Sequence, residues 1–158
     1  MSLTHLHLLL NHVPVIGTLI VTVLLAWAVF RRSGEITRVS LGLTAGIAAI
    51  AVIVFFTGEP AEDAIEKLPG FSHAITERHE EFALIATLVL GTLGALAIGA
   101  LALLRKRDIP RRVTLWSFVL SLIATGVMGY TALLGGQIRH TEVRASAAGV
   151  TSGQEIPD

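Results

Sequence analysis

Histidine is the residue type in this chain best suited to chemistry, and the 158 residues include six of them. They are His5, His7, His12, His73, His79 and His140. Neutral imidazole is the usual protein ligand for haem iron and for zinc or copper ions. The histidines therefore predict a haem or metal centre, provided that the fold brings several of them together.

Four apolar segments must position these histidines, and each is predicted to be a transmembrane helix. The segments cover residues 13–30, 39–57, 82–104 and 113–136, and none contains Asp, Glu, Lys, Arg or His. Each has about the 17–25 residues that a helix needs to cross ~30 Å of hydrocarbon. Charged residues make up only 15% of the chain, whereas soluble domains have about 25%. We predict an all-α, integral membrane four-helix bundle over residues 1–143, followed by a polar, flexible tail at 144–158.

The charges of the connecting segments predict the orientation of the bundle. The two short connections, 31–38 and 105–112, hold eight of the 12 Lys and Arg residues and only two of the 12 acids. Cytoplasmic loops of membrane proteins carry an excess of Lys and Arg. We therefore expect these connections in the cytoplasm, and both termini and the 58–81 connection on the periplasmic side of a bacterial inner membrane. All six histidines then lie on the periplasmic side.

The long 58–81 connection is predicted to contain a short helix. Pro is favoured in the first turn of a helix, and Pro-Gly commonly follows its end. Glu59 and Pro60 would begin this helix, and Pro69 and Gly70 would end it.

Small residues in the fourth apolar segment predict room for a flat cofactor. Gly129, Ala132, Gly136 and His140 are spaced i, i+3, i+7 and i+11, which forms one stripe along a helix. A b-type haem needs one or two axial imidazoles and closely packed helices with small residues towards the ring. His12 and His79 stand at the starts of the first and third segments, so His12 with either His79 or His140 would make a bis-histidine pair. The alternative is that the small residues only allow helices to pack closely.

A transition-metal ion is the other candidate occupant of this end of the bundle. Its candidate ligands are His7, His12, His73, His79 and His140. His73, Glu77 and Glu80 are also spaced to lie on one helix face, and imidazole with carboxylate suits non-haem iron, manganese or zinc. The expected periplasmic side has ten acids and four basic residues, so it would attract cations.

Several functions are disfavoured by composition. The chain has no cysteine, which excludes disulfides, iron–sulfur clusters and covalently attached c-type haem. His79-Glu80 does not begin a His-Glu-x-x-His zinc-protease motif, because residue 83 is Ala. Ser72 and His73 are neighbours, but no orienting acid or oxyanion site accompanies them. These observations favour an electron-transfer or accessory subunit over a stand-alone enzyme, and we expect no nucleic-acid partner.

Short motifs resemble those of a widespread family of uncharacterised bacterial four-span membrane proteins. His7, His12 and Pro14 match the family's His-x4-His-x-Pro opening, and Gly135, Gly136 and His140 match its Gly-Gly-x-x-x-His ending. Thr57-Gly58 and His79 resemble its loop and third-span entry, so the likeness covers most of residues 7–140. The resemblance implies a four-span fold and importance for His7, His12, His79 and His140, and it implies no activity.

The chain departs from this family pattern at two positions. Leu8 stands where the family often has Pro, and Leu133 stands near where it often has a further His inside the last span. If that inner His is a cofactor ligand in relatives, the resemblance implies one cofactor fewer here, or none.

Three functions remain open from the sequence. The first is a b-type cytochrome, or the membrane subunit of a redox complex, that moves electrons between quinone and a periplasmic carrier. The second is a protein that binds metal cations at the periplasmic face. The third is a cofactor-free structural subunit of a larger membrane complex. In all three the lipid bilayer surrounds the bundle.

Overall fold

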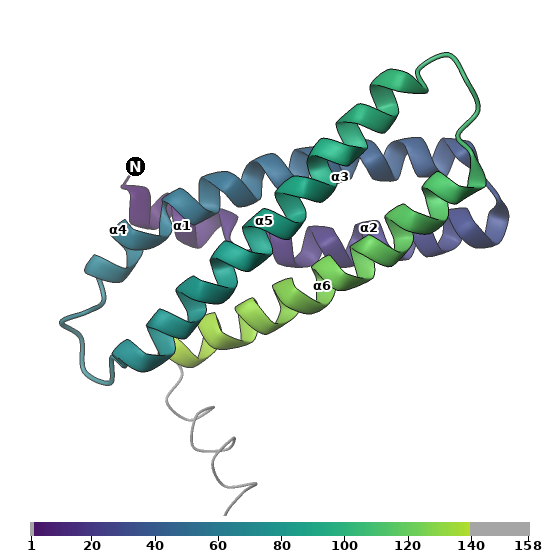
Figure 1. Cartoon of the computed structure of the whole chain (residues 1–158). Coiled ribbons are helices and arrows are strands. Elements are labelled where there is room, and N and C mark those ends of the chain that lie inside the picture. The colour runs from purple at the N-terminus through teal and green to yellow at the C-terminus, as the bar shows by residue number, and fades with distance from the viewer. Residues whose placement is uncertain (1, 140–158) are drawn as a thin grey trace, which may run out of the picture.

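Four long helices form a bundle in the computed structural model, which describes residues 2–139 (Figure 1). They are α2 (His12–Arg31), α3 (Gly34–Phe56), α5 (His73–Leu103) and α6 (Arg111–Arg139). Two short helices are α1 (Leu3–Leu10) and α4 (Gly58–Asp63). The predicted all-α four-helix bundle is confirmed, and the predicted tail at 144–158 lies outside the described residues.

The long helices form a ring in the order α2, α3, α5, α6, in which α6 packs back against α2 and neighbours run antiparallel (Figure 1). The α2–α3 and α5–α6 turns lie together at one end. We name it the basic end, because it holds segments 31–38 and 105–112. The opposite end holds α1, α4, the start of α5 and the last turn of α6. We name it the histidine end.

Polar and apolar side chains are distributed as expected for a protein in lipid. Large apolar side chains point outwards: Phe30 is 85% exposed and Trp116 is 67% exposed. The buried polar side chains among the described residues are all Ser or Thr, at positions Thr18, Thr22, Thr37, Ser40, Thr44, Thr57, Thr76, Thr114, Ser117, Ser121 and Thr131. Four helices have the length and hydropathy of membrane spans, so the chain is a multi-pass membrane protein.

Several buried hydroxyls join one helix to another. The Thr22 hydroxyl donates to the Ser121 carbonyl over 3.1 Å and lies 2.8 Å from the Thr125 hydroxyl, which ties α2 to α6. The Thr37 and Thr114 hydroxyl oxygens lie 3.1 Å apart and tie α3 to α6. Hydrogen bonds of this kind contribute about 0.6 kcal/mol each in membrane bundles.

The two turns of the basic end are held together by Arg38. Ser33 caps α3 by accepting a hydrogen bond from the Ile36 amide over 3.2 Å. One turn further along α3, the Arg38 guanidinium donates to the Leu104 carbonyl over 2.8 Å and also to the Arg107 carbonyl. These carbonyls follow the last turn of α5, where a cation is favoured by the helix dipole. One side chain therefore connects the α2–α3 hairpin to the α5–α6 hairpin.

The amino-terminal helix is interrupted at Asn11. Pro14 has no backbone N–H, so the Leu10 carbonyl loses its usual helical partner at the junction of α1 and α2. Beyond this junction α1 contacts α3 and α4, and the Thr4 hydroxyl donates to the Pro60 carbonyl over 3.1 Å. The proline thus turns α1 across the histidine end.

The largest differences from the sequence-based expectation are at the start of α5 and the end of α4. Helix α5 begins at His73, nine residues before the apolar segment at 82–104, because a helix can extend beyond the hydrocarbon layer on polar residues. The prediction that the short helix continues to Pro69 is wrong, because α4 ends at Asp63. Glu62, Asp63 and Glu66 would lie at the carboxyl end of a longer helix, where the dipole disfavours acids.

Gly94 lets α3 and α5 approach closely. A Cβ added to Gly94 would lie 2.5 Å from the Ala48 Cβ of α3, so any side chain there would push the helices apart. Gly91, one turn earlier, has no atom within 4 Å of such a Cβ. Of these two glycines, only Gly94 is therefore required by helix packing.

We predict that Gly94→Ala destabilises the bundle by about 1–3 kcal/mol, because overpacking forces the backbones to separate. Gly91→Ala is the matched control and should be neutral or slightly stabilising, since Ala is the better helix former. Thermal unfolding of both variants in detergent, followed by circular dichroism, makes the comparison. Equal melting temperatures for the two variants would contradict the packing role of Gly94.

Candidate functional site

His7 is held by the carboxyl end of α3. Its Nδ1 lies 3.0 Å from the Val54 carbonyl oxygen and 3.2 Å from the Thr57 hydroxyl. A carbonyl oxygen only accepts hydrogen bonds, so Nδ1 must carry the proton and donate it. An added Cβ at Gly58 would lie 3.9 Å from the His7 ring, so the ring packs in ordinary contact with the start of α4.

His79 is held by α6 in the same manner. Its Nδ1 lies 3.0 Å from the Thr131 carbonyl oxygen and therefore donates to it. The Thr131 hydroxyl returns a hydrogen bond to the Phe82 carbonyl of α5 over 3.2 Å. A Cβ added to Gly135 would lie 3.0 Å from the His79 ring. Gly135 therefore provides the space in which the imidazole reaches the α6 backbone.

Both imidazoles are oriented as metal-ligating histidines are. Their Nδ1–H groups are occupied by backbone carbonyls, which leaves each Nε2 lone pair available in the neutral ring. Histidine ligands of metals typically donate their other N–H to a carbonyl or carboxylate, which fixes the ring and makes the ligating nitrogen more basic. The histidine end thus contains a pair of anchored imidazoles from α1 and α5.

Asn11, which is close to His7 in the sequence, has an unpaired hydrogen-bond acceptor. It follows His7 by four residues, so both side chains leave the same face of the amino-terminal helix. Its Oδ1 is buried and has no hydrogen-bond partner among the residues that the structure describes. Buried amide oxygens are costly without a partner, so this atom marks a place where a bound molecule with a donor group would be stabilised.

An aromatic pair lies one turn along α5 from His79. The rings of Phe82 and Tyr130 meet edge to face with centroids 4.5 Å apart. Phe82 follows His79 by three residues, and Tyr130 precedes Thr131 directly. Apolar ring surface therefore lies one helical turn along α5 from the anchored imidazole.

The other candidate ligands lie elsewhere. His12 begins α2 with an exposed side chain, and His73 is exposed with its ring edge to face against Phe71. His140 lies outside the described residues. Within residues 2–139 no group of three or more His, Asp or Glu side chains could hold a metal ion, so His73, Glu77 and Glu80 do not gather into the metal face considered from their spacing.

The small-residue stripe of α6 faces away from the bundle. Gly129 and Gly136 are exposed, and an added Cβ on either would meet no atom within 4 Å, while Ala132 is partly buried between them. A flat cofactor on this stripe would therefore lie on the outer face of α6. The glycine that contacts a candidate ligand is the neighbouring Gly135. The sequence could have indicated Gly135 through its place in the Gly-Gly-x-x-x-His motif, four residues after Thr131.

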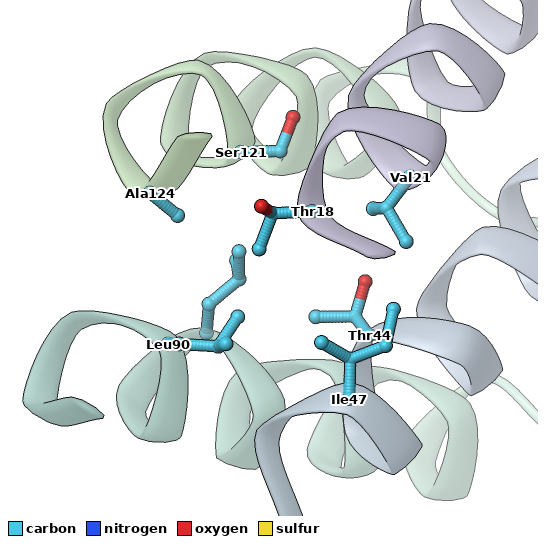
Figure 2. Close-up of a pocket in the computed structure, with 8 residues that line it drawn as sticks. Thr18, Val21, Thr44, Ile47, Leu90, Ser121 and Ala124 are labelled. Atoms are coloured by element: carbon cyan, nitrogen blue, oxygen red, sulfur yellow. The ribbon is translucent and has the colours of Figure 1, made fainter. Parts of the chain in front are cut away.

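The middle of the bundle contains a small cavity, with room for about one water molecule (Figure 2). All four long helices contribute to its lining, with Thr18, Val21, Thr44, Ile47, Leu90, Leu93, Ser121 and Ala124. Figure 2 shows Thr18, Leu90 and Ile47 around the space between the helices. None of them is titratable or a usual metal ligand. The chemistry of the described chain is therefore concentrated at the histidine end.

Comparisons with known proteins give no further assignment: no family model, no curated protein and no solved structure matches this chain. The resemblance to the four-span family stays a prediction from short motifs. Function is therefore inferred from the geometry of the described residues.

A pair of acids joins α4 to α5 beside the histidines. Glu62 of α4 is hydrogen-bonded to Glu80 of α5, the residue after His79. This bond, followed by burial and by repulsion from Glu80, Glu66 and Asp63, raises the pKa of Glu62 to about 7 from its ordinary 4.5. The folded protein thus binds this proton more tightly than the unfolded chain. The resulting stabilisation is complete below about pH 4.5 and is lost as the pH rises through about 7.

We predict that α4 opens more readily above pH 7 than at pH 5.5. The measurement is amide hydrogen exchange of residues 58–63 at the two pH values, corrected for the intrinsic exchange rate. Glu62→Gln should remove the difference, because a Gln amide donates to Glu80 at every pH. Glu59→Gln, on the same helix, should retain it. Unchanged pH dependence in Glu62→Gln would show that another group is responsible.

We predict that Gly135→Ala displaces the His79 ring by a few tenths of an ångström and weakens its hydrogen bond to Thr131. Imidazole ¹⁵N NMR of the labelled protein should show a change in the His79 Nδ1 signal. Gly136→Ala is the control, because its Cβ would meet open space. Identical His79 signals in both variants would contradict the contact.

Proposed function

We propose that this chain is a membrane-embedded b-type cytochrome, or the membrane subunit of a redox complex, in which His7 and His79 would hold the haem iron. The observation that carries the proposal is the pair of imidazoles whose Nδ1–H groups both donate to backbone carbonyls, at Val54 and Thr131. This leaves two Nε2 lone pairs at one end of the bundle. His79 was expected from the sequence as a haem ligand, and His7 takes the place that we first gave to His12 or His140.

The size of the ligand set favours haem over a bare metal ion. Zinc and Cu(II) sites usually take three or four protein ligands. The porphyrin supplies four equatorial nitrogens itself, so two imidazoles are sufficient for haem b. Two anchored imidazoles without a third neighbouring ligand in the described chain therefore fit the axial positions of a haem better than a tetrahedral site.

The backbone anchors determine what the two histidines can do. Hydrogen bonds from Nδ1–H to carbonyls hold each ring in one tautomer and strengthen electron donation from Nε2. The anchors come from α3 and α6, so the ligand positions are fixed by the bundle itself. Haem b, when bound, supplies one-electron oxidation and reduction. The chain's own contribution is to hold the imidazoles, exclude water and place the site near one membrane face.

Charge favours the periplasm for the histidine end. The basic end carries eight Lys and Arg residues, which favours the cytoplasmic side for it and the periplasmic side of a bacterial inner membrane for both termini. Segment 58–81 carries seven acids and two basic residues. An acidic surface of this kind steers positively charged partners towards it. We propose a cationic periplasmic electron carrier on that side and quinone in the bilayer as the other redox partner.

The test is the dithionite-reduced minus oxidised optical spectrum of the full chain, expressed with an ample haem supply and purified in detergent. We expect a sharp α-band and a Soret band. His7→Ala and His79→Ala should abolish or shift both bands, whereas His12→Ala should retain them, because its side chain is exposed. Millimolar imidazole should restore a bis-nitrogen spectrum to the two deficient variants, which a purely structural defect would not allow.

Two outcomes would overturn the proposal in different ways. A flat spectrum from folded protein excludes the cytochrome, and elemental analysis then separates a cation-binding protein from a cofactor-free subunit. A normal spectrum that survives loss of His7 but disappears in His12→Ala keeps the haem and refutes the ligand pair.

A further inference from the structure

The basic end of the bundle is one continuous surface made from both hairpin turns. Arg38 of α3 donates to the Leu104 and Arg107 carbonyls of the other hairpin. A Cβ added to Gly34 would also lie 3.9 Å from the Ile109 nitrogen. The two turns are therefore in contact, and their charges act at one place rather than at two separate loops (Figure 1).

Seven cationic side chains of this surface are exposed and free of ion pairs within residues 2–139. They are Arg31, Arg32, Arg105, Lys106, Arg107, Arg111 and Arg112. Arg38 is taken up by backbone carbonyls, so it is not one of them. Glu35 and Asp108 are the acids of this end, and neither forms an ion pair with another described residue. The surface therefore has a large excess of positive charge that the protein itself leaves unbalanced.

The surface lies at the depth of lipid headgroups. Trp27 precedes Arg31 by one helical turn and is 58% exposed, and Trp116 follows Arg112 by one turn and is 67% exposed. Tryptophan is enriched where hydrocarbon meets water. One turn of a helix rises about 5.4 Å, which places the cations just outside the hydrocarbon, at the level of phosphates. The chain's two tryptophans lie at this end and border the cationic surface from α2 and α6.

We propose that the basic end is a binding surface for the headgroups of anionic phospholipids, formed jointly by the α2–α3 and α5–α6 turns. Clusters of four to eight Lys and Arg next to a membrane span attract anionic lipid, by roughly fivefold for each basic residue near the surface. Guanidinium groups bind phosphate oxygens in pairs, and six of the seven free cations are arginines. The inference is independent of any cofactor at the opposite end.

The two tryptophans are built-in reporters for the test. The full chain is reconstituted in bilayers of phosphatidylcholine with a minority of phosphatidylglycerol, and one lipid at a time carries bromine on its acyl chains to quench tryptophan fluorescence. We expect brominated phosphatidylglycerol to quench as though it were enriched about fivefold over its bulk fraction. Raising the salt to 1 M should reduce the enrichment, because the Debye length falls to about 3 Å.

Variants that remove two charges at either end of the bundle distinguish lipid binding by the basic end from a general effect of the protein's charge. Arg111→Gln/Arg112→Gln should lower the enrichment towards the bulk fraction, and Arg105→Gln/Lys106→Gln should do so without altering the start of α6. Lys67→Gln/Arg78→Gln removes two charges at the histidine end and should leave the enrichment unchanged. Quenching that follows the bulk lipid fraction, or an equal loss in the Lys67/Arg78 variant, overturns the proposal. Release of the enriched lipid by millimolar inorganic phosphate would assign the surface to soluble anions instead.

Discussion

Polar groups inside a bilayer have no water to bind, so each one must find its hydrogen-bond partner within the protein. In this bundle Ser and Thr meet that requirement. Thr18 and Thr44 return their hydroxyl protons to carbonyls of their own helices, and Thr22 and Thr37 reach across to α6. These residues are small, so they also allow the helices to approach. The result is an interior in which hydroxyl-bearing side chains are mixed with buried Leu and Ala, inside an apolar exterior.

The same requirement explains how the histidines are held. An imidazole near the hydrocarbon must place its N–H on an acceptor, and backbone carbonyls near helix ends or opposite a glycine are accessible acceptors. His7 uses Val54 near the end of α3, and His79 uses Thr131 where Gly135 leaves space. Satisfying one nitrogen in this way leaves the other unpaired. A hydrogen-bonding requirement of the membrane interior thereby fixes both imidazoles in the tautomer that has its proton on Nδ1.

Charge gives the two ends different environments. At the histidine end, acids from α4 and α5 come close enough for Glu62 and Glu80 to share a hydrogen bond, which raises the pKa of Glu62 to about 7. At the basic end, Arg38 joins the two turns while its cationic neighbours stay exposed. The first surface is therefore acidic and the second basic. The two ends of this bundle of four apolar helices thus differ in the sign of their charge.

The sequence by itself determined the four membrane helices and the gathering of five of the histidines at one end. Length and hydropathy decide these features, because an uninterrupted apolar segment has few alternatives to a membrane helix. It did not determine which histidines lie together. A helix pattern gives the relative direction of residues on one helix, whereas Pro14 turns α1 towards α3 and leaves His12 outside. Nor could spacing show that Gly135, rather than Gly129 or Gly136, faces a ligand, because the rotation of α6 is set by its packing against α5 and α2. Only the tertiary structure decides contacts between residues as distant as His79 and Thr131, since these depend on how whole helices pack.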